Sequence, residues 1–266
     1  MTSLPKRKRP AASSRGGPRP RAAKRPAVVD IPPKRPAVAS PQGGPSPRGG
    51  PAGAETLLYG STGSGAAAIE AALAIARVPF RLVETATWEK NAAYDDLLKV
   101  NPLGQVPTLV LPDGTVLSES AAILIHLGLA HPESGLVPRE SSARARTLHG
   151  LVFVAANCYT AIGVIDYPER WTLPADDAAT HKRLRAGARA RLHANWAAFA
   201  DLFTRAPYLG GASPDALDLF AVVVSKWSGT RAFLREHRPA LHDTLVRIES
   251  HPAVAPVLAR HWPSTP

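Results

Sequence analysis

The sequence predicts an α/β domain followed by an all-helical domain, and two observations carry this prediction. Between residues 56 and 132 short β-type runs alternate with helical runs, which is typical of α/β architecture. Beyond Pro132 only long helical periodicities follow. A third observation, the composition of residues 1–54, adds a disordered basic tail. The expected division is a tail at 1–54, a first domain at 55–132, a linker at 133–138 and a helical domain at 139–266.

The first 54 residues differ from the rest of the chain in charge. They contain 12 Pro and 7 Gly, and they hold 12 of the 32 Lys and Arg residues against one acid, Asp30. Such a segment buries too little apolar surface to offset the entropy of ordering, so we expect disorder. The other 212 residues carry 20 basic and 20 acidic side chains, which gives no electrostatic indication of a nucleic-acid partner.

Two interpretations of the tail stay open. The run from Lys6 to Arg9, flanked by prolines, resembles a nuclear-import signal, and the tail has the composition of a loose nucleic-acid arm. The alternative is a solvated extension, or a start codon assigned too far upstream, because Arg, Ala, Gly and Pro are the residues that GC-rich bacterial codons supply.

Cysteine use and hydropathy indicate a cytoplasmic protein. The single cysteine, Cys158, excludes an intramolecular disulfide and favours a reducing compartment. The basic start lacks the apolar stretch of a signal peptide. The uncharged run between Arg146 and Asp166 contains polar residues and two glycines, so we expect a buried helix and no membrane span. The nine His residues have no metal-ligand spacing, and no metal is expected.

In the first domain the pattern predicts the order β-α-β-α-β-β-α. An Asp113-Gly114 turn between two apolar runs is a good hairpin signal, and Ser118 is a candidate cap for the helix that follows. The expected strands are 56–59, 80–84, 106–111 and 115–117, and the expected helices are 66–76, 92–99 and one running through Leu127.

In the second domain the periodicity predicts four long helices. Asp215 and Asp218 lie three residues apart at the start of the third helix, as in an acidic capping box. The expected helices are approximately 140–165, 176–204, 215–229 and 236–260.

Three short motifs follow one another at the end of the first domain: Gln105-Val106-Pro107, the hairpin Asp113-Gly114 and the pair Glu119-Ser120. Their order and spacing resemble the glutathione-binding core of bacterial-type glutathione S-transferases. The resemblance covers essentially all of residues 55–266. It implies a thioredoxin-like βαβαββα domain followed by a helical-bundle domain, and it implies glutathione as cosubstrate.

The resemblance also implies roles for individual residues. Pro107 is expected to be cis, which leaves the Val106 backbone free to pair with the cysteinyl unit of glutathione. Glu119 and Ser120 are expected to hold the γ-glutamyl end, with Glu119 at its ammonium and Ser120 at its carboxylate. Gln105 is a candidate for the glycyl end, as are Lys90 and Trp88.

The group that activates the thiol is less clearly defined. Relatives carry a Tyr, Ser or Cys between the first strand and the first helix, but this chain has Gly65 where bacterial relatives carry Cys, which excludes cysteine chemistry there. A hydroxyl donor at a helix N-terminus stabilises a thiolate. Ser64 is therefore the first candidate, with Ser61, Thr62 and Tyr59 as alternatives; all four are also ordinary turn or strand residues.

The function implied is conjugation of glutathione to a small hydrophobic electrophile, in a homodimer with a role in detoxification. Alternatives are a glutathione-binding or protein-interaction member with little transferase activity, and a glutathione-dependent reductase or isomerase. Candidates for the second-substrate wall are Phe153, Asn157, Tyr159 and residues 167–171, with Cys158 nearby.

Overall fold

A four-stranded mixed sheet forms the base of the first half. The computed structural model describes residues 55–263, so the expected tail at 1–54 lies outside the described residues. The strand order is β2-β1-β3-β4, with β1 and β2 parallel and the other pairs antiparallel. The strands are β1 (Thr56–Gly60), β2 (Phe80–Glu84), β3 (Thr108–Val110) and β4 (Val116–Ser118).

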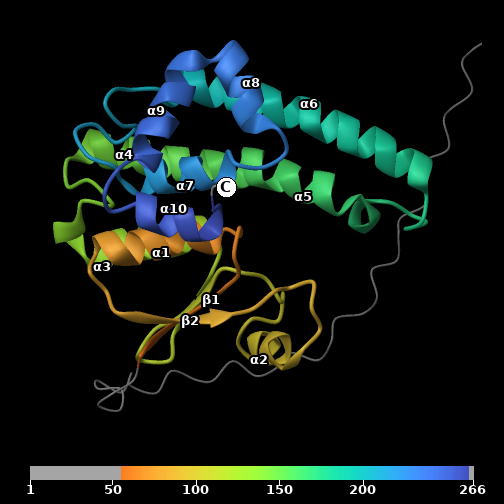
Figure 1. Ribbon diagram of the computed structural model, residues 1–266, viewed down its shortest axis with the longest axis horizontal. Coiled ribbons are helices and arrows are strands. Elements are labelled where there is room, and N and C mark those ends of the chain that lie inside the picture. The colour runs from red at the N-terminus through yellow and green to blue at the C-terminus, as the bar shows by residue number, and fades with distance from the viewer. Residues whose placement is uncertain (1–54, 264–266) are drawn as a thin grey trace, which may run out of the picture. The chain divides into compact units, whose positions relative to one another are not determined.

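Three helices cover the two faces of this sheet (Figure 1). Helices α1 (Ala66–Ile75) and α3 (Ser120–Ala130) lie on the face toward the helical half, and α2 (Ala92–Val100) lies on the other. Most of α1 is buried, because the sheet lies on one side of it and the helical half on the other. In α2 only Leu97 is buried, as expected of an outer helix. This sandwiching fixes the N-terminus of α1 at the junction of the two halves.

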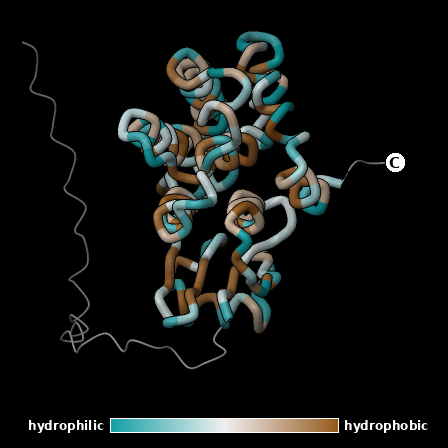
Figure 2. The backbone as a smooth tube through the Cα atoms, turned by 90° about the vertical axis from the view of Figure 1, so that its left-hand side faces the viewer, coloured by the Kyte–Doolittle hydropathy of each residue, from teal (hydrophilic) through white to brown (hydrophobic). Residues whose placement is uncertain are grey.

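The helical half is built around α7, in which every residue is buried. The buried rings of Trp196, Phe199 and Phe220 pack in the same core. Figure 2 shows that hydrophobic segments of the tube gather in the sheet and in the helices between it and the outer layer. The helices are α4 (Ser141–Phe153), α5 (Thr160–Asp166), α6 (Ala178–Phe203), α7 (Ala216–Val224), α8 (Thr230–His237), α9 (Pro239–Glu249) and α10 (Ala255–His261).

The predicted fold class is confirmed, whereas several element boundaries were wrong. Ser118 ends β4, and the residue that precedes α3 is Glu119, whose side chain makes no cap hydrogen bond. The third helix of the second half ends at Val224. The single helix expected at 236–260 is divided mainly into α9 and α10, and α8 lies almost entirely before it, because the chain leaves helical geometry at Arg238 and again between Ser250 and Val254. The capping box at Asp215 is present as predicted.

The segment Ser141–Asp166 is continuous and apolar. It consists of α4, a π-helical turn at Val154–Tyr159 and α5. The segment has 26 residues, and an 18-residue window within it has a mean hydropathy of 1.7, so by length and composition alone it could cross a membrane, a test that core helices also pass. It packs against α6 and α7, and Leu151, Val154 and Cys158 are fully buried. A third of the apolar window is buried, so the segment packs against the helical half along one face and is exposed along the other.

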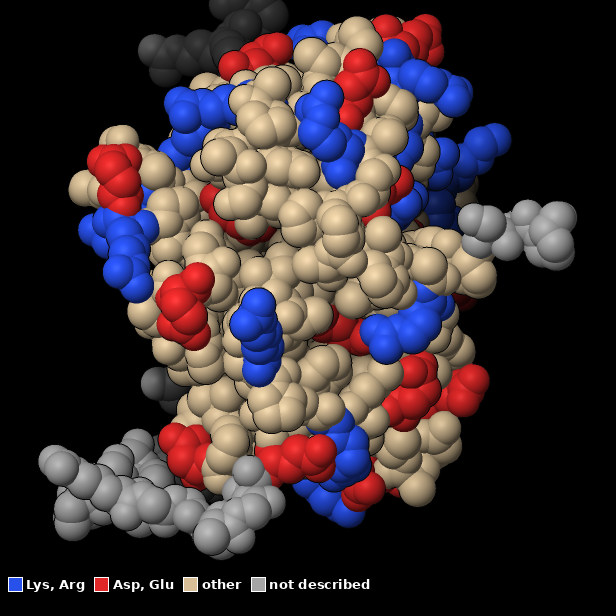
Figure 3. Space-filling view, turned by 60° about the vertical axis from the view of Figure 1, so that its left-hand side comes forward, with Lys and Arg blue, Asp and Glu red and all other residues tan. Residues whose placement is uncertain are grey.

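Charged side chains are distributed evenly over the surface that can be seen. On the face in Figure 3 acidic and basic groups alternate, and neither sign forms a continuous patch. This agrees with the balance of 20 basic and 20 acidic residues after residue 54.

Candidate functional site

A cavity of about 740 Å³ lies between the two halves. Its wall on the side of the sheet includes all five residues predicted to bind glutathione: Gln105, Val106, Pro107, Glu119 and Ser120. Lys90 and Trp88 also line it. The helical half closes the opposite side with residues of the π-helical turn, α5 and α7. Segments far apart in the sequence thus meet at one site.

The loop before β3 presents the Val106 backbone to this cavity. The Val106-Pro107 peptide bond is cis, as expected. Among the described residues neither the N–H nor the C=O of Val106 has a hydrogen-bond partner. The loop is held by the preceding carbonyl, because Gln105 O accepts bonds from Asn101 Nδ2 at 3.2 Å and Thr108 Oγ1 at 2.8 Å. Such a free backbone edge can pair with an extended peptide.

Glu119 and Ser120 form a corner between β4 and α3. Glu119 has φ 68°, a left-handed value that costs a non-glycine residue about 1–3 kcal/mol and is found mostly at functional sites. Its side chain is exposed, whereas Ser120 at the start of α3 is buried. The start of a helix offers free N–H groups and a positive dipole end. The corner can therefore bind a group that carries both a carboxylate and an ammonium.

The four candidates for thiol activation differ in position. Ser61 and Ser64 line the cavity, whereas Tyr59 and Thr62 do not. Ser64 Oγ accepts bonds from the N–H groups of Ser61 at 3.3 Å and Ala66 at 3.2 Å, which is the turn chemistry of a strand-to-helix junction. Ser61 Oγ is buried and has no partner within the described chain.

Tyr59 and Thr62 make contacts with other parts of the first domain. Tyr59 is a buried residue of β1 and pairs with Val83 and Thr108 across the sheet. Thr62 is exposed, and its N–H donates to Glu84 Oε1 at 3.2 Å. The thiol-activating role stays a prediction for each of the four residues.

Gly65 lies next to the cis-proline loop, the start of α3 and Tyr159 of the helical half. A methyl group at its Cα would lie 3.3 Å from Pro107 Cδ and 3.3 Å from Ser120 Oγ, so Gly65 faces the predicted glutathione-binding residues. The same methyl would lie 2.8 Å from the hydroxyl of Tyr159, which is closer than such contacts allow. A side chain from the helical half thus occupies the space that a residue larger than glycine would need.

The predicted second-substrate residues are only partly brought to the cavity. Tyr159, Tyr167, Glu169 and Arg170 line it. Phe153 instead packs on Phe199 and Phe203. Asn157, Trp171 and Cys158 are likewise not part of the lining. Four further lining residues were not predicted: Ile162, Asp166, Phe220 and Trp227. They lie in or beside apolar helical runs, and such runs look the same in sequence whether they form a cavity wall or a core.

Titratable groups near the cavity are shifted by burial. Burial, together with the smaller effects of Glu119, Asp166 and Tyr167, raises the pKa of Tyr159 to about 12. Burial also raises the pKa of Asp166, against the opposing effect of Arg185 and Arg189. Tyr159 is therefore protonated at neutral pH, and its oxygen can donate a hydrogen bond. Within residues 55–263 no three His, Cys, Asp or Glu side chains are grouped as metal ligands.

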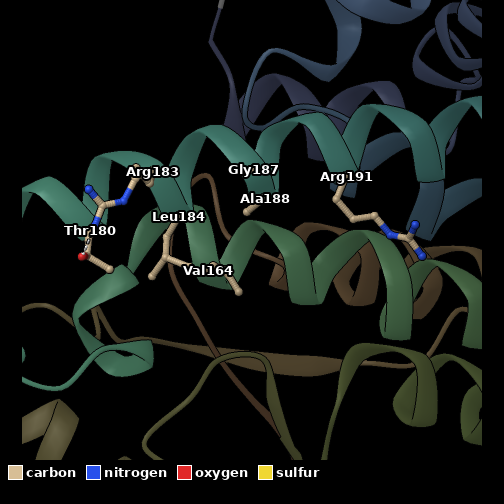
Figure 4. Close-up of a pocket in the computed structure, with 7 residues that line it drawn as sticks. All are labelled: Val164, Thr180, Arg183, Leu184, Gly187, Ala188 and Arg191. Carbon is tan, nitrogen blue, oxygen red and sulfur yellow. Dashed lines mark hydrogen bonds between the residues drawn. The ribbon is translucent and has the colours of Figure 1, made fainter. Parts of the chain in front are cut away.

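A second hollow lies outside, between α5 and α6 (Figure 4). Its centre is formed by Val164, Leu184 and Ala188, while Thr180 and Arg183 lie at one end and Arg191 at the other. Arg183 Nη2 donates to Thr180 Oγ1 at 2.6 Å. Because its polar groups do not converge on a common point, this hollow lacks the features of a ligand site.

The fold and the cavity together define a class: a thioredoxin-like domain with a cis-proline loop, followed by a helical domain that closes the site. Residues 66–129 match the family model described as "Glutathione S-transferase, N-terminal domain". The first domain is therefore similar to the N-terminal domain of glutathione S-transferases over these residues.

Two relatives from Escherichia coli and one solved structure document this similarity. The chain is 35% identical over 116 residues to the uncharacterized GST-like protein YncG of strain K12, covering 43% of this chain and 56% of the relative. It is 37% identical over 95 residues to the glutathione S-transferase GstA of O157:H7, covering 34% and 47%. The chain thus spans about half the length of these curated relatives. A sphingomonad glutathione S-transferase complexed with glutathione superposes with a TM-score of 0.64 at 27% identity, covering 78% of this chain and 100% of that one.

Proposed function

We propose that this protein is a glutathione transferase that conjugates the glutathione thiolate to a small hydrophobic electrophile. The observation that carries the proposal is that the Val106-Pro107 pair, the Glu119-Ser120 corner and the N-terminus of α1 all line one cavity of about 740 Å³. Such a volume suits a tripeptide together with a small second molecule. The sphingomonad relative complexed with glutathione supports the choice of ligand.

Each part of the site has a proposed role. The free N–H and C=O of Val106 pair with the cysteinyl unit as an added strand. Ser120 and the first N–H groups of α3 bind the γ-glutamyl carboxylate, and the exposed Glu119 pairs with the ammonium. Gln105 lies beside Val106, where it can bind the glycyl end. The sulfur is then directed toward Gly65.

The reaction needs a thiolate, because a free thiol titrates near 8.5. The thiol proton leaves to solvent, the sulfur electron pair forms a bond to an electrophilic carbon, and the leaving group departs with its own bonding pair. The aromatic and aliphatic side chains of Ile162, Phe220 and Trp227 in the opposite wall favour an apolar electrophile. Charged Glu169 and Arg170 at this wall can orient a polar substituent.

Retention on immobilised glutathione and a conjugation assay with an aryl halide test the proposal. The Ser120→Ala variant is expected to bind glutathione roughly tenfold more weakly, because it loses a hydrogen bond to a charged group. Ser250→Ala, a Ser of the outer helical region, is the matched control. If the wild type is not retained and shows no binding in calorimetry, the proposal is wrong.

The alternative functions differ in their outcome in the same assays. Binding without turnover favours a glutathione-binding or protein-interaction member of the family. Turnover only of a disulfide or of a cis double bond favours a glutathione-dependent reductase or isomerase. Full turnover in Ser64→Ala excludes Ser64 as the activating residue.

The assembly and the setting are further parts of the proposal. We expect a homodimer in the cytoplasm with a role in detoxification, and a light-scattering mass equal to one chain at micromolar concentration would contradict the dimer.

A nucleic-acid role for the tail predicts salt-sensitive binding that is lost when residues 1–54 are deleted. If the full-length protein binds no nucleic acid, that role is excluded.

A further inference from the structure

Tyr159 comes from the helical half, yet its hydroxyl lies beside Gly65 at the start of α1. The hydroxyl oxygen is 2.8 Å from the position that a Cβ of residue 65 would take. Pro107 Cδ and Ser120 Oγ are each 3.3 Å from that same position. The phenol therefore points into the corner formed by the cis-proline loop, the start of α3 and the start of α1.

The aromatic ring of Tyr159 is fixed by its neighbours. It packs on Trp227 with ring centroids 5.4 Å apart and on Phe220 with centroids 6.1 Å apart. The hydroxyl itself has no hydrogen-bond partner among residues 55–263. A rigid ring that carries an unused donor into a cavity is a preorganised group, which needs little reorganisation when a ligand arrives.

The local backbone explains why this side chain reaches the cavity. Tyr159 ends the π-helical turn Val154–Tyr159, and such turns are frequent at functional sites. The turn is stabilised from outside, because the buried Asn195 of α6 donates through Nδ2 to the Asn157 carbonyl at 2.7 Å. Within the turn Asn157 Nδ2 donates to Phe153 O at 3.1 Å.

The charges around the phenol keep it a donor. Glu119 at the start of α3 and Asp166 at the end of α5 are the acids that act on it, together with Tyr167. All three act in the same direction as burial and raise the pKa of Tyr159, to about 12. At neutral pH the group is a phenol, and it can donate a hydrogen bond to an anion without ionising itself.

We propose that Tyr159 is the catalytic residue that donates a hydrogen bond to the sulfur of bound glutathione, in the space left by the absent side chain of Gly65. This inference rests on the proposed function. The thiol proton leaves to solvent, the sulfur keeps its electron pair, and Tyr159 keeps its own proton. In this arrangement the activating group comes from the helical half instead of the turn between β1 and α1.

The pKa of the bound thiol, followed by the ultraviolet absorbance of the thiolate, tests this role. In Tyr159→Phe we expect that pKa to rise by about 1 to 2 and kcat at neutral pH to fall about 10- to 100-fold, because a hydrogen bond to the anion is lost. Glutathione affinity measured by calorimetry at a pH below the thiol pKa is expected to change less than about fivefold.

Matched variants separate Tyr159 from the other hydroxyls. Tyr208→Phe is the control for the substitution, since Tyr208 packs on His251 away from the cavity. Ser61→Ala, Ser64→Ala and Tyr59→Phe test the alternatives. Glutathione binding with an unchanged thiol pKa in Tyr159→Phe overturns the inference and leaves the proposed function intact. Absence of glutathione binding in the wild type overturns both.

A second experiment uses the contact with Gly65. Residue 65 has φ −61°, so alanine is allowed there by the backbone. In Gly65→Ala the new methyl displaces the Tyr159 hydroxyl, and we expect the thiol pKa to rise as in Tyr159→Phe. In the double variant Gly65→Ala/Tyr159→Phe the rise in the thiol pKa should be little larger than in either single variant, because both substitutions remove the same contact. Fully additive effects would contradict a shared role.

Discussion

Glu70 of α1 and His261 of α10 form a buried pair, with His261 Nε2 2.8 Å from Glu70 Oε1. The other ring nitrogen, Nδ1, accepts the N–H of Gly63 at 3.0 Å. Because Nδ1 is the acceptor, the ring proton lies on Nε2 and is donated to the carboxylate. His261 thus joins the last helix to the turn that lines the cavity.

Loss of His261 should lower the stability of the fold and remove the hydrogen bond that holds the turn at Gly63. His261→Ala leaves Glu70 with only its bond to the largely exposed Arg260, and we expect the free energy of unfolding to fall by about 2–4 kcal/mol in urea titrations. Arg260→Ala is the comparison and should cost clearly less. Equal losses in the two variants would contradict the importance of the buried bond.

Asp218 should be among the most sensitive positions of the helical half. Its carboxylate accepts the N–H groups of Leu209 at 2.8 Å, Gly210 at 2.9 Å and Asp215 at 3.0 Å. Asp218→Ala leaves these donors without a partner, and we expect a loss of about 3–5 kcal/mol. The comparison is Asp177→Ala at the half-buried start of α6, where the loss of an ordinary N-cap is expected to cost only about 1 kcal/mol in the same titration.

Glu140 should contribute a pH-dependent part of the stability. Hydrogen bonds from the Ser142 hydroxyl and from the N–H groups of Ser142 and Ala143 lower the pKa of Glu140 to about 2. A carboxyl with a lowered pKa stabilises the folded state above its ordinary pKa of 4.5, and this contribution is lost as pH falls from 4.5 toward 2.

The measurement is the difference in Tm between the wild type and Glu140→Gln across this pH range. It should be largest above pH 5 and shrink as the pH approaches 2. Glu236→Gln, at an exposed position of α8, serves as the control. A difference that does not change with pH would contradict the assignment.

Cys158 should be inert in the folded protein. Burial raises the pKa of its thiol to about 12, so almost no thiolate is present at pH 8. Mass spectrometry after iodoacetamide treatment should detect labelling at least about 1,000-fold slower than for a free thiol. The same protein in urea provides the fully reactive control, and comparable rates in both states would contradict burial.

The sequence was informative where local chemistry decides the structure. The Asp113-Gly114 turn and the Asp215–Asp218 box are short-range signals, and both elements are found as predicted. The break of the last expected helix also had local signals, Pro239 and Pro252, but the helical periodicity on both sides masked them. At Glu119 the backbone adopts a left-handed φ that no local propensity favours.

All the residues expected to bind glutathione from the side of the sheet line the cavity, whereas only some of those expected from the helical half do so. Five of the former lie within a short stretch from Gln105 to Ser120, whose spacing carried the resemblance. The approach of Tyr159 to Gly65 spans the two halves and depends on a π-helical turn that no sequence period indicates. In the sequence Tyr159 was therefore only one of several candidates for the second-substrate wall.

The cavity has walls from both halves of the chain, and this has a thermodynamic consequence. A molecule bound there contacts the cis-proline loop and α3 on one side and α5 and α7 on the other. Neither half can unfold without releasing this ligand, so the binding free energy of the ligand couples the unfolding of one half to that of the other. Saturating ligand should make the unfolding of the two halves more cooperative, in addition to raising the temperature at which it occurs.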